Sequence, residues 1–587
     1  MSSRDPRQES WLTSFLDENH LNYTTSPGMV ASPAQTRFMV SLEPEERYYP
    51  CTKQVFDEIM ARVKSPVLSD MYMAVWSRVT KLVKAKVFDP VQQSFLLDLL
   101  NIKYQHETGN YNIIPSRLDK RLYKLFAVTS QIANPMAAEK TSENRRAYEL
   151  YRHPDFARAV NSPAAVEAAA EAFAEAGLES ERRRLDAAKL KRLFQASVQA
   201  RYWETEAKPP TPDEWAEAFA RPVAGDGWPR LEDFLMTPRT ELSGHWVPRR
   251  ILYLAEGSGE IVFDLAVIKY LIRLGHRVVL AVKSNTFYDL VCLPDIRTDP
   301  VLMEMTREAE FITEPNLSKN ALAAHFKRDK PFQIIADGSM EELNLLLCSV
   351  TFARVFKEVD GVISRGLSQR SLLFETDFEF TQPVFSIAPT EDAALSVLYK
   401  PRSSKVVSFS TDELEAQAAK IVDGMRQAKR EGMTVMFYSG IVGSIPNETE
   451  TAIQVMTTFV ADLKKNQAGT HIINPSEHFI QGMDADDLMY MWEIVQRSGL
   501  IDIWRFQSYQ DIEKSFALLG RQVPPQWVGK DATFSTGCTK EMAIAQDVQK
   551  HNPEMQLIGP DPERFMRRSE YGIGLFHDTR LTEVYER

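Results

Sequence analysis

Residues 249–265 read RRILYLAEGSGEIVFDL and join three local patterns. The apolar run at 251–255 is typical of a buried strand, and Gly257 and Gly259 let the backbone after it turn tightly. Residues 263–274 are apolar on nearly every helical face, as expected of a helix buried between a sheet and another layer. The stretch therefore predicts a strand, a glycine-rich turn and a buried helix in succession.

Outward from this stretch, short apolar runs alternate with helical segments, which predicts a largely parallel sheet covered by helices. The expected strands of this sheet are 251–255, 278–283, 332–336, 361–364 and 383–387. The alternation continues beyond residue 400, with further expected strands at 405–409, 434–438, 471–473, 501–504 and 555–558. The pattern leaves open whether these later strands complete the first sheet or form a second α/β domain.

The first 240 residues have apolar residues at intervals of three and four and no strand-like alternation. Segments 53–87 and 164–203 show this pattern most clearly and predict long helices. Thr211, Pro212 and Glu214 supply an N-cap, a proline in the first turn and a capping-box acid, so a new helix is expected to start there.

These patterns together predict the α/β fold class. We expect a helical N-terminal domain (1–240), then a largely parallel Rossmann-like multi-layer sheet (245–400), extended by a C-terminal α/β region (401–587).

The bulk composition indicates a globular protein of a reducing compartment. The 587 residues carry a formal net charge of −11 that is spread along the sequence, which argues against a nucleic-acid partner. The four cysteines form no C-x-x-C pair, so neither a zinc knuckle nor a disulfide framework is expected. No window approaches about 18 uninterrupted apolar residues, so no membrane partner is expected. A cytoplasmic location is therefore expected, and the oligomeric state is left open.

Polar residues follow three of the expected strands, where parallel sheets gather their ligand sites. Glu256 and Glu260 follow the first strand and offer carboxylates suited to a hard cation. After later strands, Lys283 could hold a phosphate, Asp289 could ligate a metal and Arg365 could bind phosphate oxygens through its fork of donors. Each also has an ordinary structural explanation, such as an acid favoured at a helix N-terminus, a solvated lysine or an arginine paired with a surface carboxylate.

The order and spacing of these residues resemble the damage-control phosphatase family, a former domain of unknown function that includes proteins described as acidic-residue methyltransferases. In that family the first strand of the α/β domain ends in Asp-Asn-Ala-Gly-Phe-Glu, followed shortly by Asp-Leu. A second strand ends in Val-Lys and then Ser-Asp-Val, and a later one ends in Lys-Gly with a nearby Asn-Tyr. The resemblance covers about residues 30–390 and is specific over about 250–375.

Several positions keep the family pattern: Glu260, Asp264, Lys283, Asp289 and Arg365. At Arg365, an arginine stands in place of the family lysine. Other positions depart from the family pattern. The family's paired metal ligands, Asp-Asn, fall on Ala255 and Glu256, so one ligand is lost and the other is replaced. The family's later Asn-Tyr falls near Gln369 and Arg370.

The resemblance implies a divergent metal-dependent phosphohydrolase, or a related enzyme, that acts on a small phosphorylated metabolite. The implied cofactor is a divalent ion (magnesium, manganese, cobalt or nickel) held by Asp289 and Glu256. Lys283 and Arg365 are then expected to neutralise developing charge, with assistance from Glu260. The alternative is a non-catalytic metabolite- or partner-binding protein that keeps the fold but has lost the full metal site. Whether the chain is an enzyme is left open by these residues.

A third hypothesis places the main site in the C-terminal region. The loop 440–447 follows an expected strand, and Asn447 and Glu450 are spaced as the capping box of the next helix. Residues 535–540 form a polar turn before another helix, where Cys538 would be a nucleophile if a histidine approached it. Both segments also have the composition of ordinary turns. Deletion of residues 400–587 would separate this hypothesis from the first, unless the later strands belong to a common sheet.

Overall fold

The computed structural model describes residues 5–21, 36–43, 46–63, 65–162, 173–205, 208–237, 239–240, 246–445, 448–478, 480 and 482–566. The chain forms two compact units. The first unit comprises residues 1–317 and 326–405, and the second comprises 318–325 and 406–587, so each is assembled from two separate parts of the sequence.

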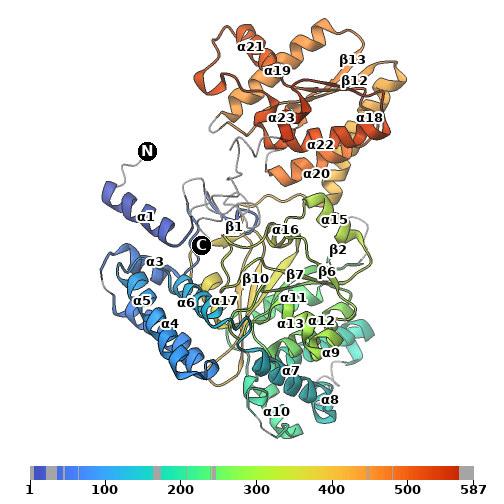
Figure 1. The fold of residues 1–587 in the computed structure, drawn as a ribbon. Helices are drawn as coiled ribbons and strands as arrows, with labels where there is room; N and C mark the ends of the chain where they lie inside the picture. The colour runs from blue at the N-terminus through green and yellow to red at the C-terminus, as the bar shows by residue number, and fades with distance from the viewer. Residues whose placement is uncertain are drawn as a thin grey trace. The chain divides into compact units, whose positions relative to one another are not determined.

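The centre of the first unit is a seven-stranded sheet with the strand order β11-β10-β8-β4-β5-β7-β6 (Figure 1). All neighbouring strands run parallel except β10 and β11, which form an antiparallel pair. The strands are β4 (Arg250–Leu254), β5 (Arg277–Val282), β6 (Glu310–Ile312), β7 (Phe332–Ala336), β8 (Gly361–Arg365), β10 (Val384–Pro389) and β11 (Leu395–Lys400). The near-continuous apolar sequences of β4 and β5 are buried on both faces, which is usual for central parallel strands.

The connections of this sheet run outward from its middle. β4 leads through α12 (Glu260–Arg273) to β5 on one side, whereas β8 leads through α17 (Gly366–Phe374) to β10 on the other. Because parallel crossovers are right-handed, the two helices cover opposite faces of the sheet. The neighbouring strands β4 and β8 therefore form a topological switch point, the place where ligands of such sheets usually bind.

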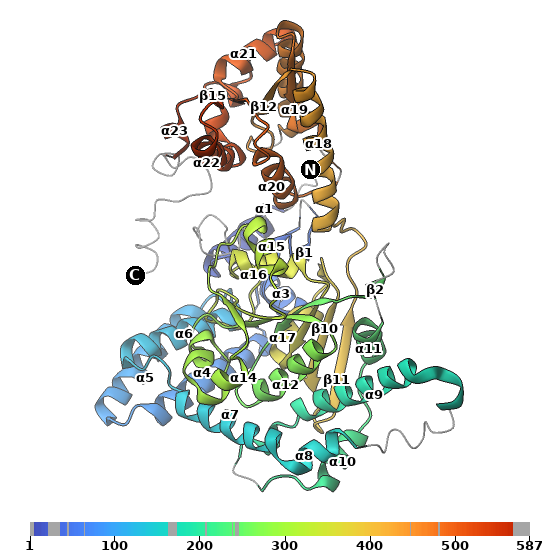
Figure 2. The same ribbon diagram turned by 90° about the vertical axis from the view of Figure 1, so that its right-hand side faces the viewer.

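Helices from the first 240 residues pack around this sheet. They are α1 (Pro6–Glu18), α3 (Lys53–Met60), α4 (Pro66–Lys86), α5 (Pro90–Thr108), α6 (Pro115–Ser130), α7 (Ala137–Arg152), α8 (Pro154–Val160), α9 (Phe173–Ser197), α10 (Pro212–Ala220) and α11 (Trp228–Met236). The helices α4, α5 and α6 lie side by side (Figure 2). One buried apolar cluster, which includes Trp203, Trp215 and Phe263, joins α7 to α12 and one face of the sheet.

Capping residues and prolines explain where these helices begin. The helix expected over 53–87 is two helices, because Ser65 caps a new helix at Pro66 and the residue before a proline avoids helical conformation. The helix expected over 164–203 is α9 followed by the short 3-10 turn η3 (Ala200–Tyr202), and residues 163–172 lie outside the described ranges. The start predicted at Thr211 is confirmed by both bonds of its capping box with Glu214.

The second unit has its own four-stranded parallel sheet with the order β13-β12-β14-β15. Its strands are β12 (Thr434–Ser439), β13 (Thr470–Ile473), β14 (Ile503–Phe506) and β15 (Gln556–Ile558). The helices α18 (Thr411–Arg430), α20 (Ala485–Gln496) and α22 (Thr536–His551) share an apolar cluster with one face, and α19 (Thr449–Asn466) packs on the other. The later strands therefore form a second sheet and do not complete the first.

The remaining elements are short. They are β1 (Val40–Ser41), which pairs with β9 (Glu379–Phe380), β2 (Arg239–Thr240), which pairs with β3 (Trp246–Val247), α13 (Leu293–Thr298), α14 (Pro300–Met305), α15 (Lys319–Lys327), α16 (Val350–Glu358), α21 (Tyr509–Leu518), α23 (Pro562–Met566) and the 3-10 turns η4 (Pro475–His478), η5 (Pro525–Trp527) and η6 (Ala532–Phe534). Among the described residues, no helix is both long and apolar enough to cross a bilayer.

The predicted fold class is confirmed: a helical N-terminal part precedes a largely parallel sheet, and an α/β region follows it. The strand expected at 405–409 is wrong, because these residues are irregular and lead into α18. Val407 in this segment is 58% exposed, and its side chain lies beside Gly482, where a Cβ would come within 2.8 Å of it. The division into three domains stays a prediction, because the contacts place 1–240 and 245–400 in one unit without testing whether each folds alone.

Candidate functional site

The five site residues singled out in the sequence lie at the carboxyl ends of three adjacent strands. Glu256 and Glu260 flank the turn after β4, and Arg365 is the last residue of β8. Lys283 directly follows β5, and Asp289 lies in the loop after it. The structure therefore brings all five to the edge of the sheet that contains the switch point between β4 and β8.

Helix α7 and the loop after β5 hold the glycine turn in place. The N–H of Ser258 donates to the carbonyl of Asp289 (3.1 Å), and the carbonyl of Glu256 accepts an N–H from the same loop (2.8 Å). From α7, the side chain of Asn144 accepts the N–H of Gly259 at 2.8 Å. These N–H groups are engaged within the protein, so the turn positions carboxylates rather than cradling a phosphate.

Two glycines give the carboxylates their space. Gly366 has a φ of +79°, and a Cβ there would lie 0.8 Å from Oε2 of Glu256, so this carboxylate occupies the place of a side chain at position 366. A Cβ at Gly257 would lie 3.9 Å from Oδ2 of Asp289 and 4.0 Å from Oε2 of Glu260. The carboxylates of Glu256, Glu260 and Asp289 are thus gathered around the two turns.

The guanidinium of Arg365 lies beneath these carboxylates and is fully buried. Its Nε lies 2.8 Å from Oδ1 of Asp264, and its Nη2 donates both to Glu260 and to the carbonyl of Ser197 (3.1 Å). Tyr253 donates its hydroxyl to the same oxygen of Asp264 at 2.7 Å. The sequence suggested that Arg365 binds phosphate oxygens. Its buried guanidinium offers no exposed donor to a phosphate arriving from solvent.

Burial dominates the electrostatics of this acidic group. Burial raises the pKa of Glu260 to about 7, although the charge of Arg365 acts in the opposite direction. Burial and the charge of Glu260 raise the pKa of Glu256 well above its ordinary value. Burial likewise raises the pKa of Asp264. One guanidinium therefore lies among three carboxyl groups whose pKa values burial raises.

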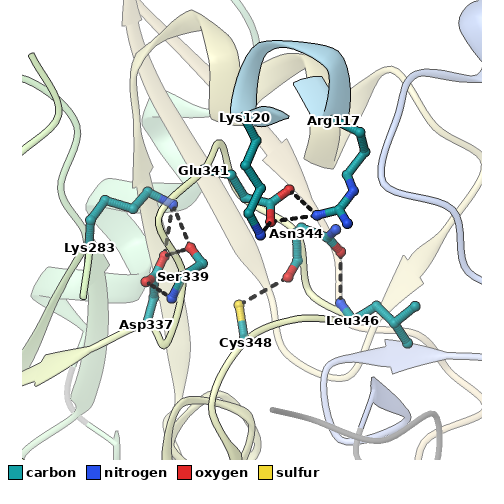
Figure 3. Close-up of polar contacts among 9 residues, drawn as sticks. All are labelled: Arg117, Lys120, Lys283, Asp337, Ser339, Glu341, Asn344, Leu346 and Cys348. Atoms are coloured by element: carbon teal, nitrogen blue, oxygen red, sulfur yellow. Dashed lines mark hydrogen bonds and ion pairs between the residues drawn. The ribbon is translucent and has the colours of Figure 1, made fainter. Parts of the chain in front are cut away.

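Lys283 forms a buried ion pair with a residue that follows β7 (Figure 3). Its Nζ lies 2.7 Å from Oδ2 of Asp337 and 3.4 Å from Oγ of Ser339. Burial alone would lower the pKa of Lys283, but the charge of Asp337 and its hydrogen bond outweigh burial and raise it. Lys283 is therefore a permanent cation at this edge, held by Asp337 in the absence of another anion.

Two further cations reach the same loop from α6 (Figure 3). Arg117 and Lys120 donate to the buried carboxylate of Glu341, at 2.8 Å and 2.6 Å. Burial would raise the pKa of Glu341, but these two charges hold it below its ordinary value. Helix α6 is thus anchored to the loop after β7 by charge.

Helix α4 supplies the most exposed cation of the site. Arg78 lies 3.1 Å from Asp119 and 3.4 Å from Asp289, and its guanidinium covers the ring of Tyr288 at 3.7 Å. The side chain of Asp289 is 55% exposed, and that of Arg78 is 38% exposed. The predicted metal ligand Asp289 is therefore a partly exposed acid beside an arginine.

The sequence reasoning missed Arg78, Arg117, Lys120, Asp337 and Glu341. Asp337 carries a usable signal, because it directly follows the expected strand 332–336, where polar residues of a parallel sheet collect. The basic residues of α4 and α6 carry none, because an arginine on an amphipathic helix has the same sequence pattern whether it faces solvent or a distant loop.

The residues of the switch point do not fit a resident divalent ion. Position 255 is an alanine, and its carbonyl already accepts the side-chain amide of Gln369 at 2.8 Å. Glu260 is paired with Arg365. Within the described ranges, no group of three or more His, Cys, Asp or Glu side chains is arranged to hold an ion. A hard cation needs several oxygen donors, so Glu256 and Asp289 alone would bind it weakly.

The segments of the C-terminal hypothesis also meet in space. The thiol of Cys538, in the first turn of α22, donates to the carbonyl of Gly440 at 3.3 Å. Cys538 is 1% exposed, and Ser535 caps its helix, which is the geometry of a packed turn. The predicted capping box cannot be placed, because Asn447 lies outside the described residues.

The model of the damage-control phosphatase ARMT1-like domain matches residues 48–406, which is most of the chain. Among solved structures, a DUF89 family protein from Pyrococcus horikoshii is similar, with 13% identity and a TM-score of 0.38 over 57% of this chain and 98% of that one. The curated proteins contain no match. The family match makes a phosphatase-like function the coarse assignment. The chain belongs to the damage-control phosphatase ARMT1-like family.

Proposed function

We propose that the carboxyl edge of the seven-stranded sheet binds a small phosphorylated metabolite, and that the chain holds this ligand without metal-assisted hydrolysis. The observation that carries the proposal is the convergence of cations from α4, α6 and β5 on the loops of this edge. Arg78, Lys120 and Lys283 come from three separate segments and are each paired with a carboxylate. Such a convergence is the usual chemistry of a phosphate site.

The exposed members of this group can exchange partners. The side chains of Arg78 and Lys120 are 38% and 25% exposed, so a phosphate dianion arriving from solvent can compete with their carboxylates. Arg365 cannot take part, because its guanidinium is fully buried. The phosphate group is therefore assigned to the side of the site formed by α4, α6 and β5.

The carboxylates on the other side suit the rest of such a ligand. Asp289 is an acceptor beside Arg78, and the carboxylate of Glu256 lies over Gly366 at the neighbouring turn. A carboxylate repels phosphate but accepts hydrogen bonds from hydroxyl groups. A phosphorylated sugar or polyol meets both requirements, with its phosphate on the cations and its hydroxyls on the acids.

Calorimetric titration in the presence of a chelator tests this proposal. Hexose phosphates should bind and the same hexoses without phosphate should not. Arg78→Met should weaken binding by about tenfold or more, because a charge-assisted hydrogen bond is lost. Lys84→Met is the matched control, since Lys84 lies on the same helix and is exposed. Equal binding of hexose and hexose phosphate, or no effect of Arg78→Met, would refute the assignment.

A metal-dependent phosphohydrolase is the second candidate, favoured by the gathering of Glu256, Glu260 and Asp289 around Gly257 and Gly366. Phosphate release from the same hexose phosphates, measured with magnesium, manganese, cobalt or nickel and with Asp289→Asn, separates the two. Release that requires metal and is lost in Asp289→Asn would establish the hydrolase. No release from a protein that binds the ligand supports the first proposal.

A further inference from the structure

The acidic centre of the switch point contains its own cation. Arg365 and Asp264 are fully buried, and the guanidinium contacts Asp264, Glu260 and the carbonyl of Ser197. The Glu256 carboxylate lies over Gly366, the next residue in the chain. An arginine does not deprotonate in a protein, so this group is a permanent positive charge among three carboxyl groups.

The backbone around this charge is fixed from several sides. Arg365 ends β8, whose register with β4 pairs Ser364 with Leu254, so its side chain starts from the interior of the sheet. The positive φ of Gly366 turns the chain into α17 directly after it. The guanidinium is therefore not a mobile side chain that could leave when another cation arrives.

The neighbouring positions are built consistently with an internal cation. Ala255 has no side-chain donor, and its carbonyl is occupied by the Gln369 amide of α17. Arg370 points elsewhere, because it donates to Ser386 and Ser396 of β10 and β11. Position 255 therefore offers no ligating group, and the amide oxygen of Gln369 is buried without a hydrogen-bond partner among the described residues, whereas Glu260 and Asp264 already face a guanidinium.

We propose that Arg365 is a fixed internal cation that takes the place of a divalent metal ion in this pocket, so that the protein folds and keeps its carboxylates together without metal. The inference rests on the proposed function for the location of the pocket. The inference concerns the charge of the pocket and its folding without metal. It can therefore fail while the proposed function holds, and the proposed function can fail while the inference holds.

Manganese titration of the intact protein, without any metabolite, is the first test. Calorimetry and thermal unfolding in chelator and in manganese should show no stoichiometric binding and no shift in Tm. Stoichiometric manganese binding with a rise in Tm, both lost in Asp289→Asn, would overturn the inference. This measurement needs no variant that disturbs the core.

Rescue of a variant is the second test. Arg365→Ala removes the internal cation and leaves Glu256, Glu260 and Asp264 facing one another, so its Tm should fall. Manganese should then raise the Tm of this variant and bind at least about tenfold more tightly than to the natural protein. If Arg365→Ala does not fold, Arg365→Ala combined with Asp264→Asn reduces the charge conflict and carries the same titration. Equal manganese affinity of variant and natural protein would refute the inference.

Discussion

The ion pair of Lys283 and Asp337 allows the sharpest stability prediction. Lys283→Met keeps most of the side-chain volume and removes the charge. The two side chains are 7% and 5% exposed and lie 2.7 Å apart, so the carboxylate of Asp337 would be left buried without its cation (Figure 3). The first unit should therefore lose a large part of its free energy of unfolding.

The magnitude follows from what Asp337 keeps. Removal of one partner of a buried ion pair typically costs about 3–5 kcal/mol. Asp337 retains the N–H of Ser339 at 2.8 Å and its hydroxyl at 2.9 Å. Each such bond contributes roughly 1 kcal/mol, so we expect a cost near the lower end, about 3 kcal/mol.

Urea unfolding combined with hydrogen exchange of the peptide that contains β5 measures this cost within the first unit. Lys84→Met, on an exposed position of α4, should change stability by less than about 0.5 kcal/mol. Adding Asp337→Asn to Lys283→Met should recover much of the loss, because no unpaired charge then remains. A cost below about 1 kcal/mol, or strict additivity of the two changes, would show that the pair is not buried in solution.

The pH dependence of this pair has a definite sign. Because the pKa of Lys283 is raised in the folded protein, the stabilisation is complete below the ordinary lysine pKa of about 10.4. It is lost as the pH rises through the higher pKa of the folded state. Measurements near pH 7 therefore report the full effect.

Three further outcomes are expected. Gly366→Ala should destabilise the first unit far more than Gly432→Ala destabilises the second. Both glycines have positive φ, but only a Cβ at position 366 meets Glu256. Equal losses of unfolding free energy would contradict this prediction. Thr211→Ala should cost about 1 kcal/mol through loss of the α10 cap, and a chemical unfolding midpoint unchanged from the natural protein would contradict it. Burial raises the pKa of Glu541 to about 7, so the folded protein binds this proton more tightly than the unfolded chain does, and stability falls as the pH rises from about 4.3 to 7. Glu541→Gln should therefore raise the Tm of the second unit at pH 8 but hardly at pH 5. An equal change in Tm at both pH values would refute the burial of Glu541.

Most of the fold could be predicted because parallel strands are marked by short apolar runs between helical segments. β4, β5 and β7 carry that signal in full. The run at 405–409 has the same composition but no partner strand, and strand formation depends on pairing that a local pattern does not contain. β11 was not predicted, although its hairpin with β10 gives it one of the longest registers of the sheet.

The site could be predicted in its location but not in its pairing. Positions after successive parallel strands meet at one edge whatever their side chains are, so Glu256, Lys283 and Arg365 were found from strand ends alone. Which carboxylate each cation contacts depends on side-chain directions and on helices far away in sequence. Arg365 therefore looked like a phosphate ligand, whereas the structure buries it against Asp264.

The division of the second unit has a consequence for how this chain is made. Residues 318–325 belong to that unit, yet the ribosome completes them well before any of its strands. Within this segment Leu322 and Lys319 are buried, and the ammonium of Lys319 lies 2.6 Å from Asp487, which is synthesised much later. A nascent chain that ends at 405 would thus display a segment whose lysine lacks Asp487 as an ion-pair partner. Closure of the second unit should therefore wait for the synthesis of its later strands, and a truncation at residue 405 is not a clean removal of a domain.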